Sequence, residues 1–426
     1  MFQASQGYFY ALLQIMSNKA KYRSSSHSLK FMNAEKQLTL SDVIYEYRRV
    51  AQYLIDLVWL DLDINSSKIN TPKFIDAKYT NLLDTWLSAR MKQCIGKQVL
   101  GMLQAATKKQ QKRYYQLKKL QNQGKPTQHL QRKIDKTKLV KPDASNINME
   151  LDSRFIDFQQ GNHFDIFIRF KSIGQKLQIK IPVKHTKVSR KWQEQGEITK
   201  SIRISENTLN LLYKIKSKAN KGKATVAIDQ GSTTVCTLSD GQVTGKCPHG
   251  HDLKSIQQKL ARSKKGSKGF KKAQEHRKNH IGWSINQLNF SGVKTLRVEK
   301  LHDVGRGQSR GRFLSHWTYT LINDKLKSVA EMQGIELIEV DNKYRSQRCN
   351  NCAFVHKLNR SSEKFCCRNC SHETNADSNA SLNLLEDLAE IPYAVFEDKL
   401  NHKAGFFWFK DKLVCQEGIV LDMLKG

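Results

Sequence analysis

The chain has 426 residues, and 72 Lys and Arg against 39 Asp and Glu give it a formal net charge of +33 at pH 7. Its length predicts two to four domains, and 39% apolar residues with 6 Trp, 13 Tyr and 18 Phe exclude a wholly disordered chain. The absence of any run of 18 apolar residues excludes an ordinary membrane-spanning helix, and residues 1–16 lack the basic start and cleavage site of a signal peptide.

The N-terminal third is predicted to be helical. Apolar residues at helical spacing over residues 43–58, with Ser41 as N-cap, predict one helix, and the same pattern over 82–103 predicts a second. Residues 108–141 carry twelve Lys and Arg against one Asp and are broken by a Gly-Lys-Pro sequence. This basic stretch fits either a helical hairpin or a floppy linker. We expect residues 41–145 to form one helical lobe, which the family resemblance described below makes the recognition lobe.

After Pro142 the pattern changes to short, alternating strands. The predicted strands are Met149–Gln159, Phe164–Phe170, Lys176–Ile181 and Ser201–Ile204. They predict a small antiparallel β-barrel or sandwich, which we assign to residues 146–220. Residues 28–34, within an N-terminal segment of residues 1–40, could add a first strand, so that the helical lobe would be inserted in the barrel.

An α/β unit is predicted for residues 221–345. The predicted elements are strands over 224–228, 233–238 and near Val243, one or two helices over 253–290, a strand over 293–298, a helix over 314–332 and a strand over 335–340. Strands in hairpin order followed by helix, strand, helix and strand are the ribonuclease H-type arrangement. The fold class expected is therefore α/β and multidomain.

Five of the nine cysteines fall within 22 residues, at Cys349, Cys352, Cys366, Cys367 and Cys370. Two Cys-x-x-Cys pairs, Cys349 with Cys352 and Cys367 with Cys370, predict a closed, structural four-thiolate zinc site over residues 346–374. A chain without a secretion signal is expected in a reducing compartment, where such thiols bind metal rather than form disulfides. Cys366 is expected to be a spare thiol. Reserve ligands are His356 and His372.

Three acids stand at the ends of predicted elements: Asp229 and Glu299 each follow a strand, and Asp377 opens a helix. Singly, each has an ordinary structural explanation, as a turn former, an ion-pair partner of Lys300 or Arg297, and an N-cap. Together, on a strongly basic chain, they point to phosphodiester cleavage, in which carboxylates hold two Mg²⁺ ions on either side of the scissile phosphate.

The sequences around these acids are recognisable. Ala227-Ile228-Asp229-Gln230-Gly231, Val298-Glu299-Lys300-Leu301 and Asn375-Ala376-Asp377-Ser378-Asn379-Ala380-Ser381 resemble the three RuvC motifs of TnpB, the nuclease of bacterial insertion sequences, which is related to miniature type V CRISPR effectors. Residues 344–349 and 365–367 resemble the lead-in to that family's zinc ribbon, which also lies between the second and third motifs. The similarity is specific from Ala224 to Leu385, with the third-motif helix in residues 375–390.

Carried over by position, the family's metal-binding and catalytic acids fall on Asp229, Glu299 and Asp377. The departures are Asn375, where the family often has Asp; Arg345, where it often has Thr; and Ala353 and Ser371, where knuckle glycines are usual. None removes a matching acid. Upstream, the resemblance is one of order alone: a helical lobe inserted in a wedge-like barrel.

The resemblance implies an RNA-guided DNA endonuclease. Its partners would be a guide RNA and double-stranded target DNA beside a short flanking motif, its cofactors Mg²⁺ at one RuvC site and structural Zn²⁺, and its location the prokaryotic cytoplasm. A charge of +33 agrees with nucleic-acid partners. The alternatives are a nuclease-inactive RNA-guided regulator, an unguided structure-specific RuvC-type nuclease, and a transposase. Residues 386–426 carry eight acids against five Lys, and the tail, residues 391–426, is assigned no role.

Overall fold

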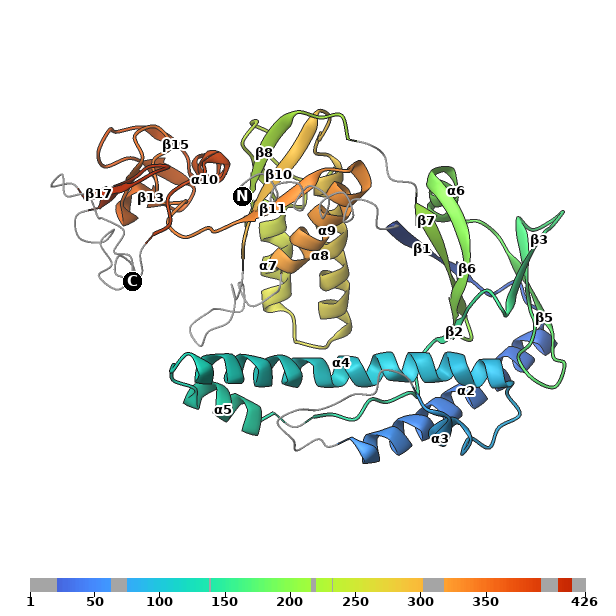
Figure 1. The fold of residues 1–426 in the computed structure, drawn as a ribbon. Helices are drawn as coiled ribbons and strands as arrows, with labels where there is room; N and C mark the ends of the chain where they lie inside the picture. Colours follow the sequence, from blue (N-terminus) through green and yellow to red (C-terminus); the bar gives the residue numbers. More distant parts are fainter. Residues whose placement is uncertain are drawn as a thin grey trace, which may run out of the picture. The chain divides into compact units, whose positions relative to one another are not determined.

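The computed structural model describes residues 21–62, 75–137, 139–215, 220–231, 233–301, 318–391 and 405–415. The chain divides into two compact units, residues 1–216 and 217–426 (Figure 1). No described helix combines the length and the apolar composition needed to cross a bilayer.

Helices dominate the first half of the N-terminal unit. They are α2 (Ala34–Asp61), α3 (Ala77–Thr80), α4 (Ala89–Asn122) and α5 (Gln128–Asp135). The first begins before the predicted cap at Ser41, because Asn33 Oδ1 accepts the Lys36 N–H at 3.2 Å and caps the helix there. The long α4 joins the second predicted helix to the basic stretch and packs against α2.

The basic stretch is a helical hairpin, not a floppy linker. The C-terminal half of α4 and the short α5 lie against each other, and the Gln110 side-chain amide donates to the Ile134 carbonyl at 3.3 Å. Leu117 and Ile134 are buried at 9% and 4% exposure, so the hairpin has a small apolar seam. Its Lys and Arg side chains otherwise face solvent.

The strands of this unit form two separate sheets among the described residues. One contains β1 (Lys21–Ser28), β7 (Thr208–Ile215), β6 (Gly196–Ile204) and β2 (Met149–Leu151) in that order, and the other contains β3 (Ile156–Gln160), β4 (Ile166–Phe170) and β5 (Ile179–Val183). The predicted closed barrel is therefore wrong. Closure would need an edge strand of one sheet, β1 or β2, to pair with an edge strand of the other, β3 or β5, and no such pair is found among the described residues. Helix α6 (Lys187–Gln195) follows β5 in the sequence.

The predicted insertion of the helices is observed, with a shift in its first strand. β1 ends at Ser28, where the predicted strand was to begin, and it pairs antiparallel with β7. Helices α2 to α5 lie in the sequence between β1 and β2 of one sheet. The sequence analysis missed α6 and β7.

The C-terminal unit is built on a mixed sheet with the order β11-β10-β8-β9. Its strands are β8 (Ala224–Asp229), β9 (Thr237–Leu238), β10 (Val293–Glu299) and β11 (Glu336–Val340), and its helices are α7 (Leu253–Arg262), α8 (Lys268–Asn286) and α9 (Thr318–Gln333). β10 runs parallel to β8 and β11, while β8 and β9 form a hairpin. The third hairpin strand is reduced to one bridge between Thr237 and Val243.

This order of strands and helices is the predicted one. Ile228, Leu296 and Val298 from the sheet and Ile281 and Ile322 from the helices are buried in one core, so the sheet and helices form a single packed body. The start of the predicted last helix, residues 314–317, lies outside the described residues.

The cysteine pairs lie in a small module after β11. It contains β12 (Phe354–Val355), the 3₁₀ turn η1 (Lys357–Asn359), β13 (Arg360–Ser361), β14 (Lys364–Cys366) and β15 (Glu373–Asn375), followed by helix α10 (Ala376–Leu385). Part of the tail joins it, because β16 (Phe406–Trp408) and β17 (Leu413–Cys415) extend β12 into a three-stranded sheet. The rest of the tail, residues 392–404 and 416–426, lies outside the described residues.

Candidate metal centres

Three acids, Asp229, Glu299 and Asp377, converge at one edge of the sheet. Asp229 and Glu299 are the last residues of β8 and β10, whose parallel pairing brings their carboxyl ends together. Asp377 lies in the first turn of α10, which packs against β8, β9 and β10. The acids are distant in the sequence, and the topology alone brings them together. We call them the acid cluster.

The turn after β8 allows this convergence. A Cβ atom on Gly231 would lie 2.4 Å from the Thr234 carbonyl oxygen, so a glycine is required where the chain leaves Asp229. At the other side, Asn375 caps α10 by accepting the N–H groups of Asp377 and Ser378 at 2.9 and 3.1 Å. Asn375 thus fixes the helix end that carries Asp377.

Burial and mutual repulsion make the ionised forms of Asp229 and Glu299 unfavourable. Burial, followed by repulsion from Glu299 and Asp377, raises the pKa of Asp229 well above its usual range. Burial also raises the pKa of Glu299 to about 7, and a hydrogen bond with Asp229 limits the rise. Without a metal ion, Asp229 and Glu299 therefore hold a proton between them at neutral pH.

One cation already faces the acid cluster, and the sequence analysis missed it. Arg360, at the start of β13, donates from Nη2 to Asp377 Oδ1 at 2.8 Å and lowers the pKa of both Asp229 and Glu299. Arg360 lies between the two cysteine pairs, so no local motif marks it. The cysteine module thus contributes a side chain to the acid cluster.

A second missed residue, Arg345, holds the helix of Asp377 in place. Its Nη1 donates to the carbonyls of Asn383 and Glu386 at the C-terminal end of α10, and its Nε donates to the Asp341 carbonyl at 2.7 Å. Burial, together with neighbouring arginines, lowers the pKa of Arg345 to about 10. Arg345 occupies the position where the resembling family often has Thr, and here it ties α10 to the end of β11.

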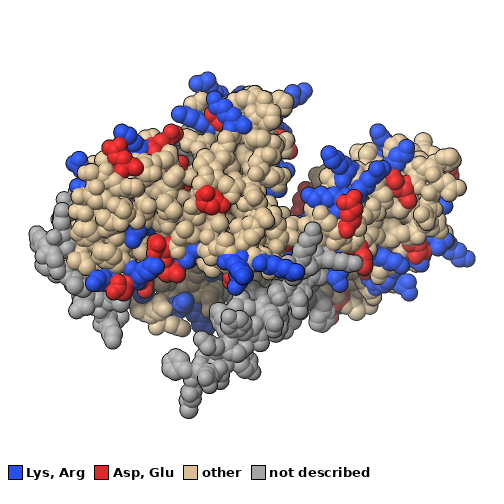
Figure 2. Space-filling view, turned by 90° about the horizontal axis from the view of Figure 1, so that it is seen from above, with Lys and Arg blue, Asp and Glu red and all other residues tan. Residues whose placement is uncertain are grey.

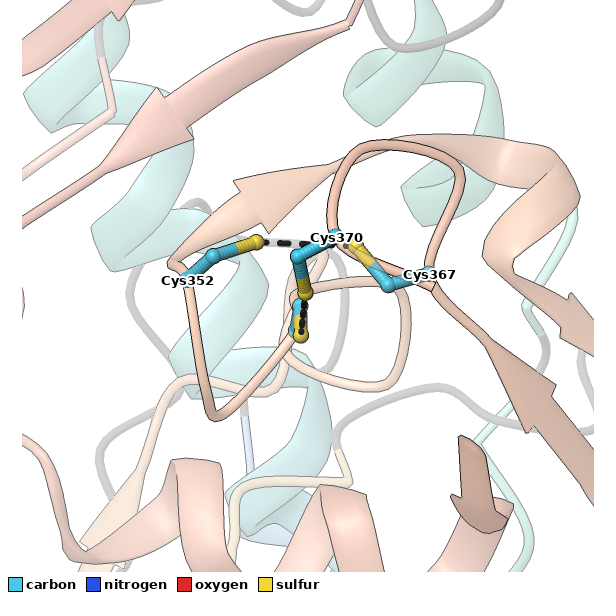
Figure 3. Close-up of side chains that lie close together, drawn as sticks. Cys352, Cys367 and Cys370 are labelled. Carbon is cyan, nitrogen blue, oxygen red and sulfur yellow. Dashed lines mark hydrogen bonds between the residues drawn. The ribbon is translucent and has the colours of Figure 1, made fainter. Parts of the chain in front are cut away.

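The four cysteines of the two Cys-x-x-Cys pairs form a second cluster. The sulfur atoms of Cys349, Cys352, Cys367 and Cys370 all lie within 4.8 Å of one another and could hold a metal ion. Across the pairs, Cys349 Sγ is 3.7 Å from Cys370 Sγ, and Cys352 Sγ is 3.5 Å from Cys367 Sγ (Figure 3). We call this set the thiol cluster.

The two pairs are held by matching turns. The Ala353 N–H donates to the Cys349 carbonyl at 2.9 Å, and the Ser371 N–H donates to the Cys367 carbonyl at 3.0 Å. Ala353 and Ser371 have φ angles of 67° and 57°, in the left-handed region that favours glycine. The knuckle geometry therefore survives without the glycines that are usual in the resembling family, at some cost in backbone strain.

The thiols differ in how readily they lose a proton. Burial raises the pKa of Cys349, and it raises that of Cys367 to about 11. At Cys370 burial acts in the same direction, but hydrogen bonds led by the His372 backbone lower the pKa to about 7. Cys366, His356 and His372 lie outside the group of four that could hold a metal ion.

Comparison with known proteins agrees with the resemblance. Residues 319–384, from α9 through the cysteine module to α10, match the Cas12f1-like TNB domain. Two curated relatives are both called CRISPR-associated endodeoxyribonuclease Cas12f1. The one from Sulfoacidibacillus thermotolerans is 30% identical over 36% of this chain and 36% of its own length. The one from Syntrophomonas palmitatica is 28% identical over 30% of this chain and 26% of its own length.

Solved structures with some similarity come from the same group of proteins. A cryo-EM structure of a Cas12f1–sgRNA–target DNA complex covers 86% of this chain and 99% of its own, with 16% identity and a TM-score of 0.45. A structure of CasPhi-2 (Cas12j) with crRNA and phosphorothioate-DNA covers 88% and 93%, with 11% identity and a TM-score of 0.43. The family model and the curated relatives confirm the resemblance to miniature type V effectors, and the match spans about a third of those relatives' length.

Proposed function

We propose that this relative of the miniature type V effectors is an RNA-guided DNA endonuclease that cuts double-stranded DNA at a single, Mg²⁺-dependent RuvC site. The observation that carries the proposal is the convergence of Asp229, Glu299 and Asp377 at one end of the sheet. Guide RNA would select the target by base pairing, and the protein would read duplex shape and a short flanking motif.

The acid cluster suits magnesium. Its donors are carboxylate oxygens, the ligands that Mg²⁺ prefers together with water and phosphate oxygens. Three carboxyl groups lie together beside the Arg360 guanidinium. Burial raises the pKa of both Asp229 and Glu299, and repulsion between the acids adds to the rise, so a divalent cation would be favoured there. Bound Mg²⁺ would neutralise the scissile phosphate and lower the pKa of an attacking water.

The chain's own residues prepare this site. Asp229 and Glu299 would hold the ions from two strands whose core positions are buried, and Asp377 would do so from the N-terminal turn of α10, which itself favours negative charge. Metal binding would favour the ionised forms of Asp229 and Glu299. The Arg360 guanidinium, which contacts Asp377, would then be able to donate to a phosphate oxygen.

The thiol cluster is proposed to bind one structural Zn²⁺. Four sulfur donors match the tetrahedral all-cysteine sites of zinc, and four protein ligands leave no open position for catalysis. Its role would be to fix the module that places Arg360 and α10 against the sheet. A chelator should therefore damage cleavage even though zinc takes no part in the chemistry.

The partners proposed are a guide RNA and double-stranded DNA. The net charge of +33 and the Lys and Arg side chains on the exposed surface of both units fit two polyanions (Figure 2). The solvated, basic face of α4 and α5 is a large part of this charge.

A direct test begins with expression of the chain together with the DNA that flanks its gene. Co-purified RNA is sequenced, and the complex is given plasmids with a matching target and randomised flanking bases. We expect a discrete RNA and cleavage that requires Mg²⁺ and one flanking motif. A preparation without RNA that cuts branched DNA unaided would replace the proposal with an unguided nuclease. Guided binding without any cutting in Mg²⁺ would replace it with a regulator.

A further inference from the structure

A hollow in the N-terminal unit lies away from both metal centres in the sequence. It has a volume of about 770 Å³ and lies between the turn from β3 to β4 and the start of α6. A second hollow of about 410 Å³ shares His185 and Arg190 with it and adds Lys187, Lys191 and Glu194. We call the two together the His185 hollow.

Two segments distant in sequence form the walls, and specific contacts hold them. In the β3–β4 turn, a Cβ atom on Gly161 would lie 2.5 Å from the Phe164 carbonyl oxygen and 2.8 Å from the Phe167 ring, so the tight turn needs glycine. The opposite wall is tied to this turn because the His185 N–H donates to Asp165 Oδ2 at 2.8 Å. The hollow is thus a built feature of the fold.

Aromatic rings and cations lie close together here: Phe158 and Phe164 line the hollow together with Lys184 and Arg190, and further rings pack beside them. The Phe164 ring meets those of Phe31 and Phe167 edge to face, at centroid distances of 5.5 and 5.6 Å. The Lys184 ammonium lies over both Phe31 and Phe164, at 5.2 and 5.6 Å, and Lys191 lies over the Trp192 ring at 5.0 Å. Proteins that bind single-stranded nucleic acid combine these two features, since bases stack on aromatic rings and cations follow the backbone.

One polar atom of the lining, the buried Nδ1 of His185, has no hydrogen-bond partner among the described residues. The other ring nitrogen of His185 contacts the Gln193 amide at 3.0 Å, so the ring is held with Nδ1 unsatisfied. Burial lowers the pKa of His185 more than Asp165 raises it, and the neutral ring can donate or accept at Nδ1. Unsatisfied buried atoms of this kind call for a polar ligand.

The residues that line the His185 hollow also exclude some classes of ligand. The Lys and Arg rim is unsuited to an apolar small molecule, and the bases of an intact duplex are stacked on one another and offer no face to Phe164. The amides of Gln159, Gln160 and Asn162 line the same hollow and can hydrogen-bond a base edge.

We propose that the His185 hollow receives one unstacked nucleobase of a single-stranded nucleic acid, with the adjoining phosphates held by Arg190, Lys187 and Lys191. The base would stack on Phe164 and hydrogen-bond to His185 Nδ1. This site does not require the chain to cut DNA, so it stands apart from the proposed nuclease. An unpaired base of a guide RNA and one of a separated DNA strand present the same chemistry.

The test uses the full chain and short oligonucleotides of one sequence carrying 2-aminopurine, as single-stranded RNA, single-stranded DNA and duplex DNA. Stacking quenches 2-aminopurine, so we expect quenching with a single strand and none with the duplex. Preference for RNA would assign the site to the guide, and preference for DNA to an open target strand. Quenching only by the duplex, or by none of the three, would overturn the proposal.

Variants locate the binding site. Phe164→Ala should weaken single-strand binding roughly tenfold, as expected for loss of one stacked base, while Phe164→Trp retains it. Tyr45→Ala is the matched control, since Tyr45 is an aromatic side chain on α2 that is 71% exposed. Arg190→Gln, at an exposed position, should weaken binding without disturbing the fold.

Cross-linking decides the case if a variant folds poorly. RNA with a single 4-thiouridine should cross-link to residues 158–166 or 184–193 of the parent chain. Cross-links confined to other residues, or undiminished affinity in both Phe164→Ala and Arg190→Gln, would overturn the proposal. Asp229→Asn, which tests cleavage, should keep full quenching, so failure of the nuclease proposal and failure of this one give different results.

Discussion

The thiol cluster and the acid cluster belong to one unit and assemble in opposite ways. The four thiols come from 22 consecutive residues, in two matching turns, whereas the three acids come from two strands and a helix far apart in the chain. The pKa shifts of the two clusters also have opposite directions. Hydrogen bonds lower the pKa of Cys370 to about 7, whereas burial raises the pKa of Glu299 to about 7. A local turn can thus favour one ionised ligand before metal arrives, whereas a cluster made by topology retains a proton until a cation displaces it.

The largest expected effect removes the thiol cluster. Cys367→Ser replaces a buried ligand and should abolish zinc binding, because structural zinc sites contribute roughly 10–16 kcal/mol of apparent binding free energy in isolated zinc-finger peptides. Elemental analysis of the purified chain should find about one zinc per parent molecule and almost none in the variant. Cys366→Ser is the neighbouring control and should keep its zinc. Loss of zinc in both variants would contradict the four-ligand assignment.

Next in size is the loss of one acid ligand. Asp229→Asn keeps the shape of the side chain and removes the charge that would hold Mg²⁺, so guided cleavage should fall on the order of a thousandfold, or roughly 4 kcal/mol of barrier. Binding of RNA and target DNA should stay within about twofold, measured by filter binding. Asp324→Asn, on the exposed face of α9, is the control. Equal cleavage by Asp229→Asn and the parent would remove Asp229 from the site.

Arg360 belongs to the cysteine module and contacts the acid cluster. Its removal therefore tests whether one cluster affects the pKa values of the other. Because Arg360 lowers the pKa of both Asp229 and Glu299, Arg360→Gln should raise the carboxyl titration of the metal-free chain above pH 7. Infrared spectroscopy can follow the carboxyl C=O band across the titration. Arg368→Gln changes an exposed arginine of the same module and should leave the band where it is. An unchanged titration in Arg360→Gln would show that the guanidinium does not act on the acids in solution.

The smallest effect is on stability. Burial in the folded state raises the pKa of Glu299 from 4.5 to about 7. The protonated Glu299 therefore stabilises the folded state fully below pH 4.5, and this stabilisation is lost as the pH rises through 7. In EDTA, the free energy of unfolding of the parent should therefore fall by on the order of 2 kcal/mol more across this window than that of Glu299→Gln. Urea unfolding at a series of pH values measures the difference. Saturating Mg²⁺ should remove it, and parallel curves for both chains in EDTA would contradict the shift.

How much the sequence predicts depends on the separation of the interacting residues. The knuckle spacing brings four cysteines together through local turns, and the strand–helix order of residues 224–340 follows from periodicity. The acid cluster was predicted only through the order of motifs, since no periodicity tells which strand ends meet. Asp229 and Glu299 meet because β8 and β10 are parallel neighbours, which is a property of the whole sheet.

Most of the features that the sequence analysis missed depend on residues that are far apart in the sequence or on polar segments without an apolar pattern. The barrel prediction failed because the edge strands of the two sheets do not pair among the described residues, and no local pattern shows which strand edges meet. Helix α6 was missed because its nine residues are mostly polar and bury only Ser189. Arg360 and Arg345 were missed because each acts on a partner distant in sequence, Asp377 and the end of α10. The helix start at Asn33 was missed because α2 begins with a polar turn, so its apolar pattern starts later than the helix.

The pairing of β16 and β17 with β12 has a consequence for how the protein is made. Phe406, Trp408 and Leu413 are buried against the cysteine module, and the Arg348 guanidinium donates to the Trp408 carbonyl at 2.8 Å. The sheet beside the thiols therefore cannot form until residues 406–415 have been made, which is after both cysteine pairs. A stop codon before Leu413, or an affinity tag placed inside residues 405–415, would leave that module unfinished although every metal ligand had been synthesised.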